Sequence, residues 1–336
     1  EITFEGTYNE LLSSNTSTGN ALRHKHNLKE NIREANHFYN IGPVTQNNLN
    51  NVKTSIPKHV LTVLTGVAGS GKSTLVKAGF ENNDHTIFID QKAVQGSNRS
   101  NLLTYLGVFD SVRSFFSKET GLNKAMFSYN SKGACPNCGG KGYIKTELAF
   151  MGDFSQTCEV CHGKRYKQEV LDATIDGYSI ADVLDLTVDE GIIFFDKKND
   201  IKSKLQSVSK TGLNYMSLGQ PLSTLSGGEI QRVKLAQHLD EEIKNSIFIF
   251  DEPTTGLHES DIPILMECFD DLIDQNNTVI LIEHNLSIMC EADWIIDVGP
   301  GPGLDGGKVQ FSGTPKNFID SSETLTSKHL KRYINQ

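Results

Sequence analysis

Residues 66–74 read GVAGSGKST, and this stretch decides the fold. Its spacing, Gly66-x-x-x-x-Gly71-Lys72-Ser73, is the Walker A pattern, which requires a strand before it and a helix after it. The apolar, β-branched run HVLTVLT (59–65) predicts that strand, and LVKAGF (75–80) has helical character. Backbone N–H groups of such a loop, beside a helix N-terminus, cradle phosphates. The residues expected to bind a nucleotide are Gly66, Gly69, Ser70, Gly71, Lys72, Ser73 and Thr74.

Within this loop, Lys72 is expected to reach the outer phosphates and the Ser73 hydroxyl to hold Mg²⁺. An acidic pair follows another buried strand, SIFIFD (246–251). Asp251 fits the Walker B aspartate, a second holder of Mg²⁺, and Glu252 is expected to orient and polarise the attacking water. Phosphoryl transfer needs positioning and charge stabilisation, so a carboxylate beside a metal suits it. The alternative is a solvated acidic turn.

Strands and helices alternate along the rest of the chain, which predicts an α/β protein with a largely parallel sheet. The further predicted strands are 85–90, 278–283, 293–299 and 306–313, and a helix is predicted at 261–275. Residues 91–225 are less regular and indicate an insertion, in which 180–195 has helical apolar spacing. The expected organisation is an extension or linker at 1–40, a nucleotide-binding core at 41–92 and 226–336, and an inserted domain at 93–225.

Four of the six cysteines form two C-x-x-C pairs inside this insertion. The pattern Cys135-x2-Cys138-x19-Cys158-x2-Cys161 is the spacing of a tetrahedral four-cysteine zinc site. Four thiolates close the coordination shell, so the predicted site is structural and pins the base of a β-hairpin within 133–166. A pair of disulfides, or His162 as a substitute ligand, are the alternatives.

The 336 residues carry a net charge of −9, which excludes nucleic-acid binding over the whole surface and leaves only a local patch. Between residues 130 and 170 there are six basic and four acidic side chains, a net charge of +2. The candidate DNA contacts are Lys132, Lys141, Lys145 and Arg165, and the alternative is an ordinary solvated hairpin. No apolar run approaches the length of a membrane span. The chain does not begin with Met, so we expect a piece of a longer protein.

The stretch LSTLSGGEIQRVKLAQHL (222–239) resembles the signature of ATP-binding-cassette (ABC) ATPases. The other sequence elements of that family occur in the same order here. The Walker A loop is followed by Gln91 after the second predicted strand, then by the signature, the acidic pair Asp251–Glu252, and His284 after a later predicted strand. The resemblance implies that Gln91 senses Mg²⁺ and the attacking water and that His284 contacts the γ-phosphate. It also implies that the signature, Ser226, Gly227, Gly228 and Glu229, serves an ATP held by another cassette. The chain would therefore need a second cassette, either another copy or the missing half of its parent protein.

Several longer stretches are similar to the C-terminal half of the UvrA family. They include GKRYKQEVL (163–171), LGQPLSTLSGGEIQRVKLA (218–236) and IEHNLSIMCEADWIIDVGPG (282–301), and the similarity runs from about residue 41 to about residue 320. It implies the ATP-binding and ATP-hydrolysing half of a DNA-damage-recognition protein of nucleotide excision repair, which binds DNA without base-sequence readout. The implied cofactors are ATP/ADP, Mg²⁺ and one structural Zn²⁺.

The implied partners are double-stranded DNA, damaged or drug-bound, and further repair subunits, in the cytoplasm and away from membranes. After Gln91 the family's proline- and arginine-containing segment is replaced by AVQGSNRSN (93–101). This departure leaves open a UvrA-like drug-resistance paralogue that does not act in repair. A transport-type ABC cassette is a further alternative, which the cysteine section disfavours.

Overall fold

The computed structural model describes residues 2–23, 27–92, 100–148, 152–241 and 243–335, without the side chains of 146–154. Most of the divergent segment after Gln91, residues 93–99, therefore lies outside the described part of the chain.

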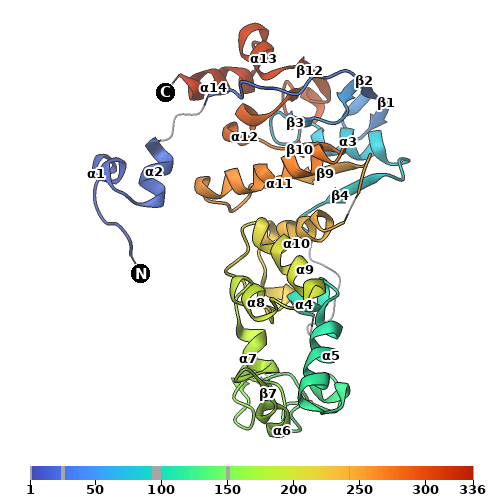
Figure 1. Cartoon of the computed structure of the whole chain (residues 1–336). Helices are drawn as coiled ribbons and strands as arrows, with labels where there is room; N and C mark the ends of the chain where they lie inside the picture. The colour runs from blue at the N-terminus through green and yellow to red at the C-terminus, as the bar shows by residue number, and fades with distance from the viewer. Residues whose placement is uncertain (1, 24–26, 93–99, 149–151, 242, 336) are drawn as a thin grey trace. The chain divides into compact units, whose positions relative to one another are not determined.

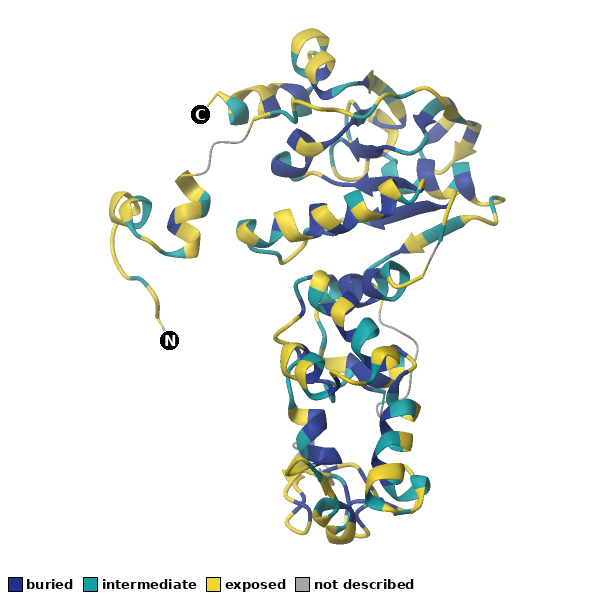
Figure 2. Cartoon of the chain, viewed as in Figure 1, coloured by how far each residue is buried: buried dark blue, intermediate teal, exposed yellow. Residues whose placement is uncertain are grey.

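A six-stranded sheet carries the Walker motifs (Figure 1). The strand order is β12-β11-β3-β10-β9-β4, and all neighbours are parallel except β11 and β12. These strands are β3 Leu61–Thr65, β4 Thr86–Ile89, β9 Ile247–Asp251, β10 Thr278–Ile282, β11 Trp294–Gly299 and β12 Lys308–Gly313. The predicted strands and the largely parallel sheet are confirmed. All residues of β3 and β10 are buried, as continuous apolar runs in a parallel sheet require, and these strands are dark blue in Figure 2.

Different elements cover the two faces of this sheet. On one face, Ile249 shares a core with helix α3 (Lys72–Phe80) and with the hairpin of β1 (Phe38–Gln46) and β2 (Leu49–Pro57). Because successive side chains alternate along a strand, Phe250 points to the other face. There its ring lies 4.8 Å from that of Phe269, on helix α11 (Ile262–Asp274). Helix α11 confirms the helix predicted at 261–275.

The chain divides into two compact units, residues 1–92 with 241–336, and residues 93–240. The first unit also contains α1 Tyr8–Ser13, α2 Ser17–Arg23, α12 Leu286–Glu291, α13 Pro315–Ser321 and α14 Leu325–Ile334. The second contains α4 Leu102–Tyr105, α5 Phe109–Thr120, α6 Gln168–Asp172, α7 Ile180–Asp185, α8 Val188–Phe194, α9 Asn199–Lys210 and α10 Gly227–Leu239, with hairpins β5 (Tyr143–Leu148)–β6 (Gly152–Thr157) and β7 (Thr174–Ile175)–β8 (Tyr178–Ser179).

Helix α10 lies in the second unit, whereas the sequence assigned residues from 226 onward to the nucleotide-binding core. The reason is packing, because Val233 and Ala236 are fully buried in the hydrophobic core of the second unit. The helical spacing at 180–195 also forms two helices, α7 and α8, rather than one. Leu186 is extended, and Thr187 caps α8 through a reciprocal pair of hydrogen bonds with Glu190.

Part of the segment predicted as an extension or linker, residues 1–40, contacts the rest of the first unit. The Arg33 guanidinium lies 2.8 Å from Asp270 and 3.4 Å from the buried Asp293. Asp293 also accepts the Leu61 N–H, at the start of β3, at 2.9 Å. None of the described helices is long and apolar enough to span a bilayer.

Candidate nucleotide-binding and metal sites

The Walker A loop joins β3 to α3 through three glycines with positive φ, Gly66, Gly69 and Gly71. Gly66 has φ 129°, and a Cβ added there would lie 2.0 Å from the Val298 carbonyl oxygen on β11. Only glycine fits this position, because both the backbone conformation and the close approach exclude a side chain. Gly71 (φ 105°) precedes the first residue of α3, so the helix N-terminus points its N–H groups into the loop.

Lys72 lies within the same loop. Its Nζ donates to the carbonyl oxygens of Gly66 at 2.8 Å and Val67 at 2.9 Å. Burial lowers the pKa of Lys72 below its ordinary value, against the attraction of Glu252 and Asp251. The loop thus holds an ammonium group beside the N-terminus of α3, and both attract phosphate.

The predicted Mg²⁺ holders lie close together. Ser73 Oγ is 3.4 Å and 3.5 Å from the two carboxylate oxygens of Asp251, at the end of β9. A hydroxyl and a carboxylate are hard oxygen ligands, the kind that Mg²⁺ prefers. This donor set therefore fits the ion. Thr74 lies beside them, and its Oγ1 accepts from Asn47 Nδ2 at 3.2 Å.

Glu252, the predicted water-polarising residue, follows directly and has a left-handed backbone, φ 52°. A non-glycine residue in this region is strained by about 1–3 kcal/mol, so its neighbours must hold it there. Its N–H donates to the Ile282 carbonyl at 2.9 Å, and Gln91 Nε2 donates to the Glu252 carbonyl at 3.2 Å. His284 Nδ1 lies 3.8 Å from Glu252 Oε1. The structure thus brings Gln91, Glu252 and His284 together at the carboxyl ends of adjacent strands.

Sequence reasoning missed Glu283 as a functional residue. It directly follows β10, is almost fully buried, and accepts hydrogen bonds from Thr254 and from the N–H groups of His284 and Asn285. The available signal was an acidic residue directly after a fully apolar strand and before the candidate histidine. Its burial and its link to Thr254 depend on tertiary structure.

The signature lies in the second unit, at the start of α10. Ser226 is the N-cap, its Oγ accepts from the Glu229 N–H at 3.3 Å, and Glu229 Oε2 accepts from the Ser226 N–H at 2.8 Å. Although burial acts to raise the pKa of Glu229, hydrogen bonds from Ser226 and from Tyr215 lower it overall. Gly227 and Gly228 form the first two helical positions. Their N–H groups are those that a helix N-terminus offers to an anion.

The four predicted zinc ligands form one buried cluster at the base of the β5–β6 hairpin. Their Sγ atoms all lie within 4.8 Å of one another, with Cys135 to Cys158 at 4.0 Å and Cys138 to Cys161 at 3.7 Å. Four sulfurs at about 2.3 Å from a tetrahedral zinc lie about 3.8 Å apart, so the cluster fits this ion.

Two amides support the sulfur atoms of this cluster. The Gly142 N–H donates to Cys138 Sγ at 3.2 Å. Asn137 donates to Cys158 Sγ at 3.3 Å, and this hydrogen bond, together with hydrogen bonds from Cys161 and Val160, lowers the pKa of the Cys158 thiol to about 6. Both contacts favour thiolates, the form that binds metal.

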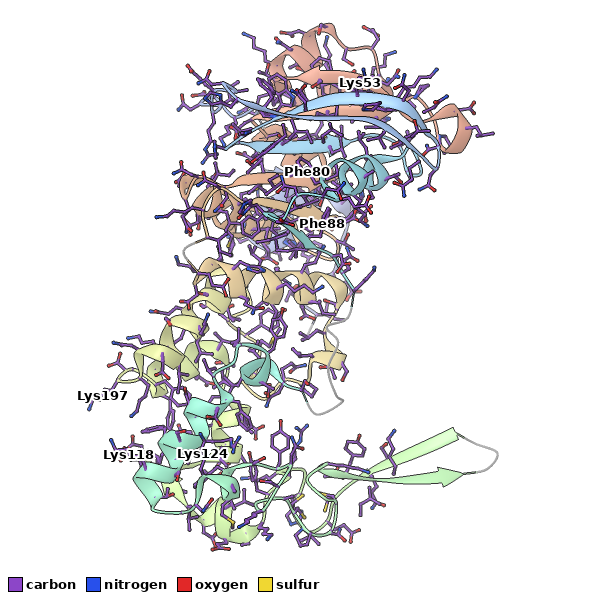
Figure 3. All side chains as sticks on the ribbon, turned by 90° about the vertical axis from the view of Figure 1, so that its right-hand side faces the viewer. Lys53, Phe80, Phe88, Lys118, Lys124 and Lys197 are labelled. Carbon is purple, nitrogen blue, oxygen red and sulfur yellow. The ribbon has the colours of Figure 1, made fainter. Side chains whose placement is uncertain are left out.

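The candidate DNA contacts lie in the same stretch of the chain as this cluster. Lys132, Lys141 and Lys145 are exposed. Arg165 is half-buried, and its guanidinium lies 5.3 Å from the centroid of the Tyr129 ring, within the range of a cation–π contact. Strands β5 and β6 pair antiparallel, as the predicted hairpin requires, and both are seen in Figure 3, whereas the zinc ion stays a prediction.

Comparisons with known proteins place these features in a family. A family model described as ABC transporter matches residues 49–255. UvrABC system protein A of Clostridium perfringens (strain 13 / Type A) is 42% identical over 99% of this chain and 39% of its own length. The protein of the same name from Bacillus subtilis (strain 168) is 40% identical, with the same coverage. The crystal structure of UvrA2 from Deinococcus radiodurans matches with a TM-score of 0.91, 37% identity, and coverage of 99% of this chain and 44% of that one. The chain spans about two fifths of the length of these relatives.

Proposed function

Because the chain belongs to the UvrA family of ABC ATPases, we propose that it is the ATP-hydrolysing half of a DNA-damage-recognition protein of nucleotide excision repair. The observation that carries this proposal is the meeting of Ser73, Asp251, Glu252 and His284 beside the Walker A loop, in a chain that also carries a buried four-cysteine cluster. The first group suits phosphoryl transfer, and the cluster suits a structural metal.

In the proposed reaction, the loop N–H groups and Lys72 bind the phosphates of ATP. Ser73, Asp251 and Gln91 would hold Mg²⁺, which would neutralise charge on the phosphates. Glu252 accepts a hydrogen bond from the attacking water and orients it in line with the γ-phosphate. His284, 3.8 Å from Glu252, is placed to contact the γ-phosphate itself. The main contribution of these residues is positioning.

A second cassette completes the site in this proposal. Ser226, Gly227 and Gly228 begin a helix of the second unit, and they serve a nucleotide bound to another cassette. That cassette is a second copy of this chain or the rest of a longer protein.

We propose that the zinc-site hairpin, residues 133–166, contacts the backbone of double-stranded DNA. Zinc held by Cys135, Cys138, Cys158 and Cys161 would stabilise the base of the hairpin and perform no chemistry, because four protein ligands fill its shell. The exposed Lys132, Lys141 and Lys145, with Arg165, would supply phosphate contacts that position the protein without reading base sequence. Further repair subunits and a cytoplasmic location belong to the same proposal.

The test is DNA binding by the full-length protein, with damaged and undamaged duplexes, each with and without ATP. We expect the preference for damaged DNA to depend on ATP. Equal binding to both duplexes under all conditions would contradict damage recognition. Survival of a repair-deficient strain after ultraviolet irradiation, when it expresses the full-length protein, would exclude a paralogue that does not act in repair.

A further inference from the structure

Glu283 lies between the two loops that carry the candidate catalytic side chains. It is 1% exposed and follows β10 directly. The loop after β9 carries Glu252 and Thr254, and the loop after β10 carries His284 and Asn285. Glu283 has no role of its own in the proposed reaction, and the hydrogen bonds that it accepts indicate what it does.

The two oxygens of Glu283 divide four donors between the two loops. Oε1 accepts from the Thr254 N–H at 3.0 Å and from the Thr254 hydroxyl at 2.5 Å. Oε2 accepts from the N–H groups of His284 at 2.9 Å and Asn285 at 3.2 Å. One oxygen thus serves the first loop and the other serves the second. A carboxylate has about four acceptor positions, so its capacity is used on these two loops.

We propose that Glu283 is a positioning residue that locks these loops together and so fixes the distance between Glu252 and His284. The catalytic roles of those two side chains rest on the function proposed above. The strained φ of 52° at Glu252 requires such a constraint. The N–H of Glu252 donates to the carbonyl of Ile282, the residue before Glu283. The Glu283 side chain accepts a hydrogen bond from the N–H of Thr254, two residues after Glu252. If this link is lost, the loop can relax and move Glu252 out of place.

Glutamine cannot replace this carboxylate, although it has the same shape. Whichever way its amide is turned, the NH2 group faces at least one backbone N–H that now donates to an oxygen. On the Oε1 side it opposes the N–H of Thr254, and on the Oε2 side it opposes those of His284 and Asn285. A backbone N–H can only donate, so the backbone hydrogen bonds between residue 283 and one of the two loops are lost. Hydrogen bonds to charged groups are the stronger ones, so the loss is large.

The experiment compares Glu283→Gln, Thr254→Val and the control Glu291→Gln in the whole chain, by amide hydrogen exchange and by ATP turnover. Glu291 is an exposed glutamate at the end of α12 and takes the same chemical change. In Glu283→Gln we expect exchange to rise about tenfold or more in at least one of the two segments, 252–256 and 283–286, namely the one that faces the amide NH2 group. Thr254→Val removes only the hydroxyl donor, so a smaller rise in 252–256 is expected, and Glu291→Gln should match the wild type.

In turnover assays, Glu283→Gln should lower kcat by about tenfold or more with KM for ATP changed by less than about twofold, because the substitution leaves the residues of the phosphate-binding loop unchanged. Unchanged exchange in both segments would overturn the inference. So would an unchanged kcat in Glu283→Gln when the wild type hydrolyses ATP. If the wild type hydrolyses no ATP, the proposed function fails, and the exchange data alone decide the role of Glu283. If Glu283→Gln does not fold, Thr254→Val decides the role of Glu283, and unchanged exchange in 252–256 would overturn the inference.

Discussion

Replacing Gly66 with alanine should weaken ATP binding by about a hundredfold or more in a chain that still folds. The new Cβ would lie 2.0 Å from the Val298 carbonyl oxygen, whereas ordinary contact begins at 3.4 Å. The loop must therefore withdraw by about 1.4 Å, the difference between these distances, because the contact is with the backbone of β11, which cannot turn away as the end of a side chain can. The φ of 129° adds a backbone strain of about 1–3 kcal/mol.

The magnitude follows from the tolerance of hydrogen bonds. N–H···O distances lie within a range of about 0.5 Å, so a displacement of this size breaks the contacts that the loop makes with phosphate. Each hydrogen bond to a charged group contributes about 1.5–3 kcal/mol. Loss of two therefore weakens ATP binding by about 3–6 kcal/mol, which is at least about a hundredfold in Kd.

Titration with ATP in the presence of Mg²⁺ measures this change, and denaturant unfolding measures the loss of stability. Gly121→Ala is the matched control. Gly121 ends α5 in the second unit with φ 75°, and a Cβ there meets nothing within 4 Å. The control should lose about 1 kcal/mol of stability and no ATP affinity. Gly66→Ala with a Kd within about twofold of the wild type would refute the reasoning.

Three further predictions concern the acid, the metal and the DNA contacts. Glu252→Gln should retain ATP binding and lose about a hundredfold or more in turnover. The control Glu267→Gln, at an exposed glutamate, should keep its turnover. Equal turnover in both variants would show that Glu252 does not polarise the attacking water. Metal analysis should find about one zinc per chain, and chelation should expose the hairpin to protease, so a zinc-free chain with full resistance would contradict the structural site. The double variant Lys141→Ala, Lys145→Ala should bind DNA more weakly, and the slope of log K against log salt should fall by up to about 2. The control variant changes the exposed Lys118 and Lys197 to alanine (Figure 3), and it should keep both the affinity and the slope. Identical slopes for the two pairs would exclude these hairpin contacts.

The sequence predicted the sheet because its strands are short, largely apolar runs. This pattern is typical of strands that are buried on both faces of a parallel sheet. It also predicted the Walker A loop and the cysteine cluster, because fixed spacing carries their geometry. The break between α7 and α8 was readable in principle, since Thr187 and Glu190 form a capping-box pair, but the apolar spacing masked it.

Other features depend on packing and could not be predicted. The assignment of α10 to the second unit follows from which core buries Val233 and Ala236, and local periodicity does not carry that information. The role of Glu283 is similar. In sequence it is one acidic residue among 41, and its function follows from burial between two loops that are distant along the chain.

The central claim is that this chain is one cassette of an ATPase whose site a second cassette completes. The most direct measurement is the ATPase rate per mole of chain over a wide range of chain concentrations, with ATP binding measured in parallel. We predict that the rate per mole rises with concentration while the affinity for ATP stays constant. A rate per mole that is the same at all concentrations would contradict the shared site.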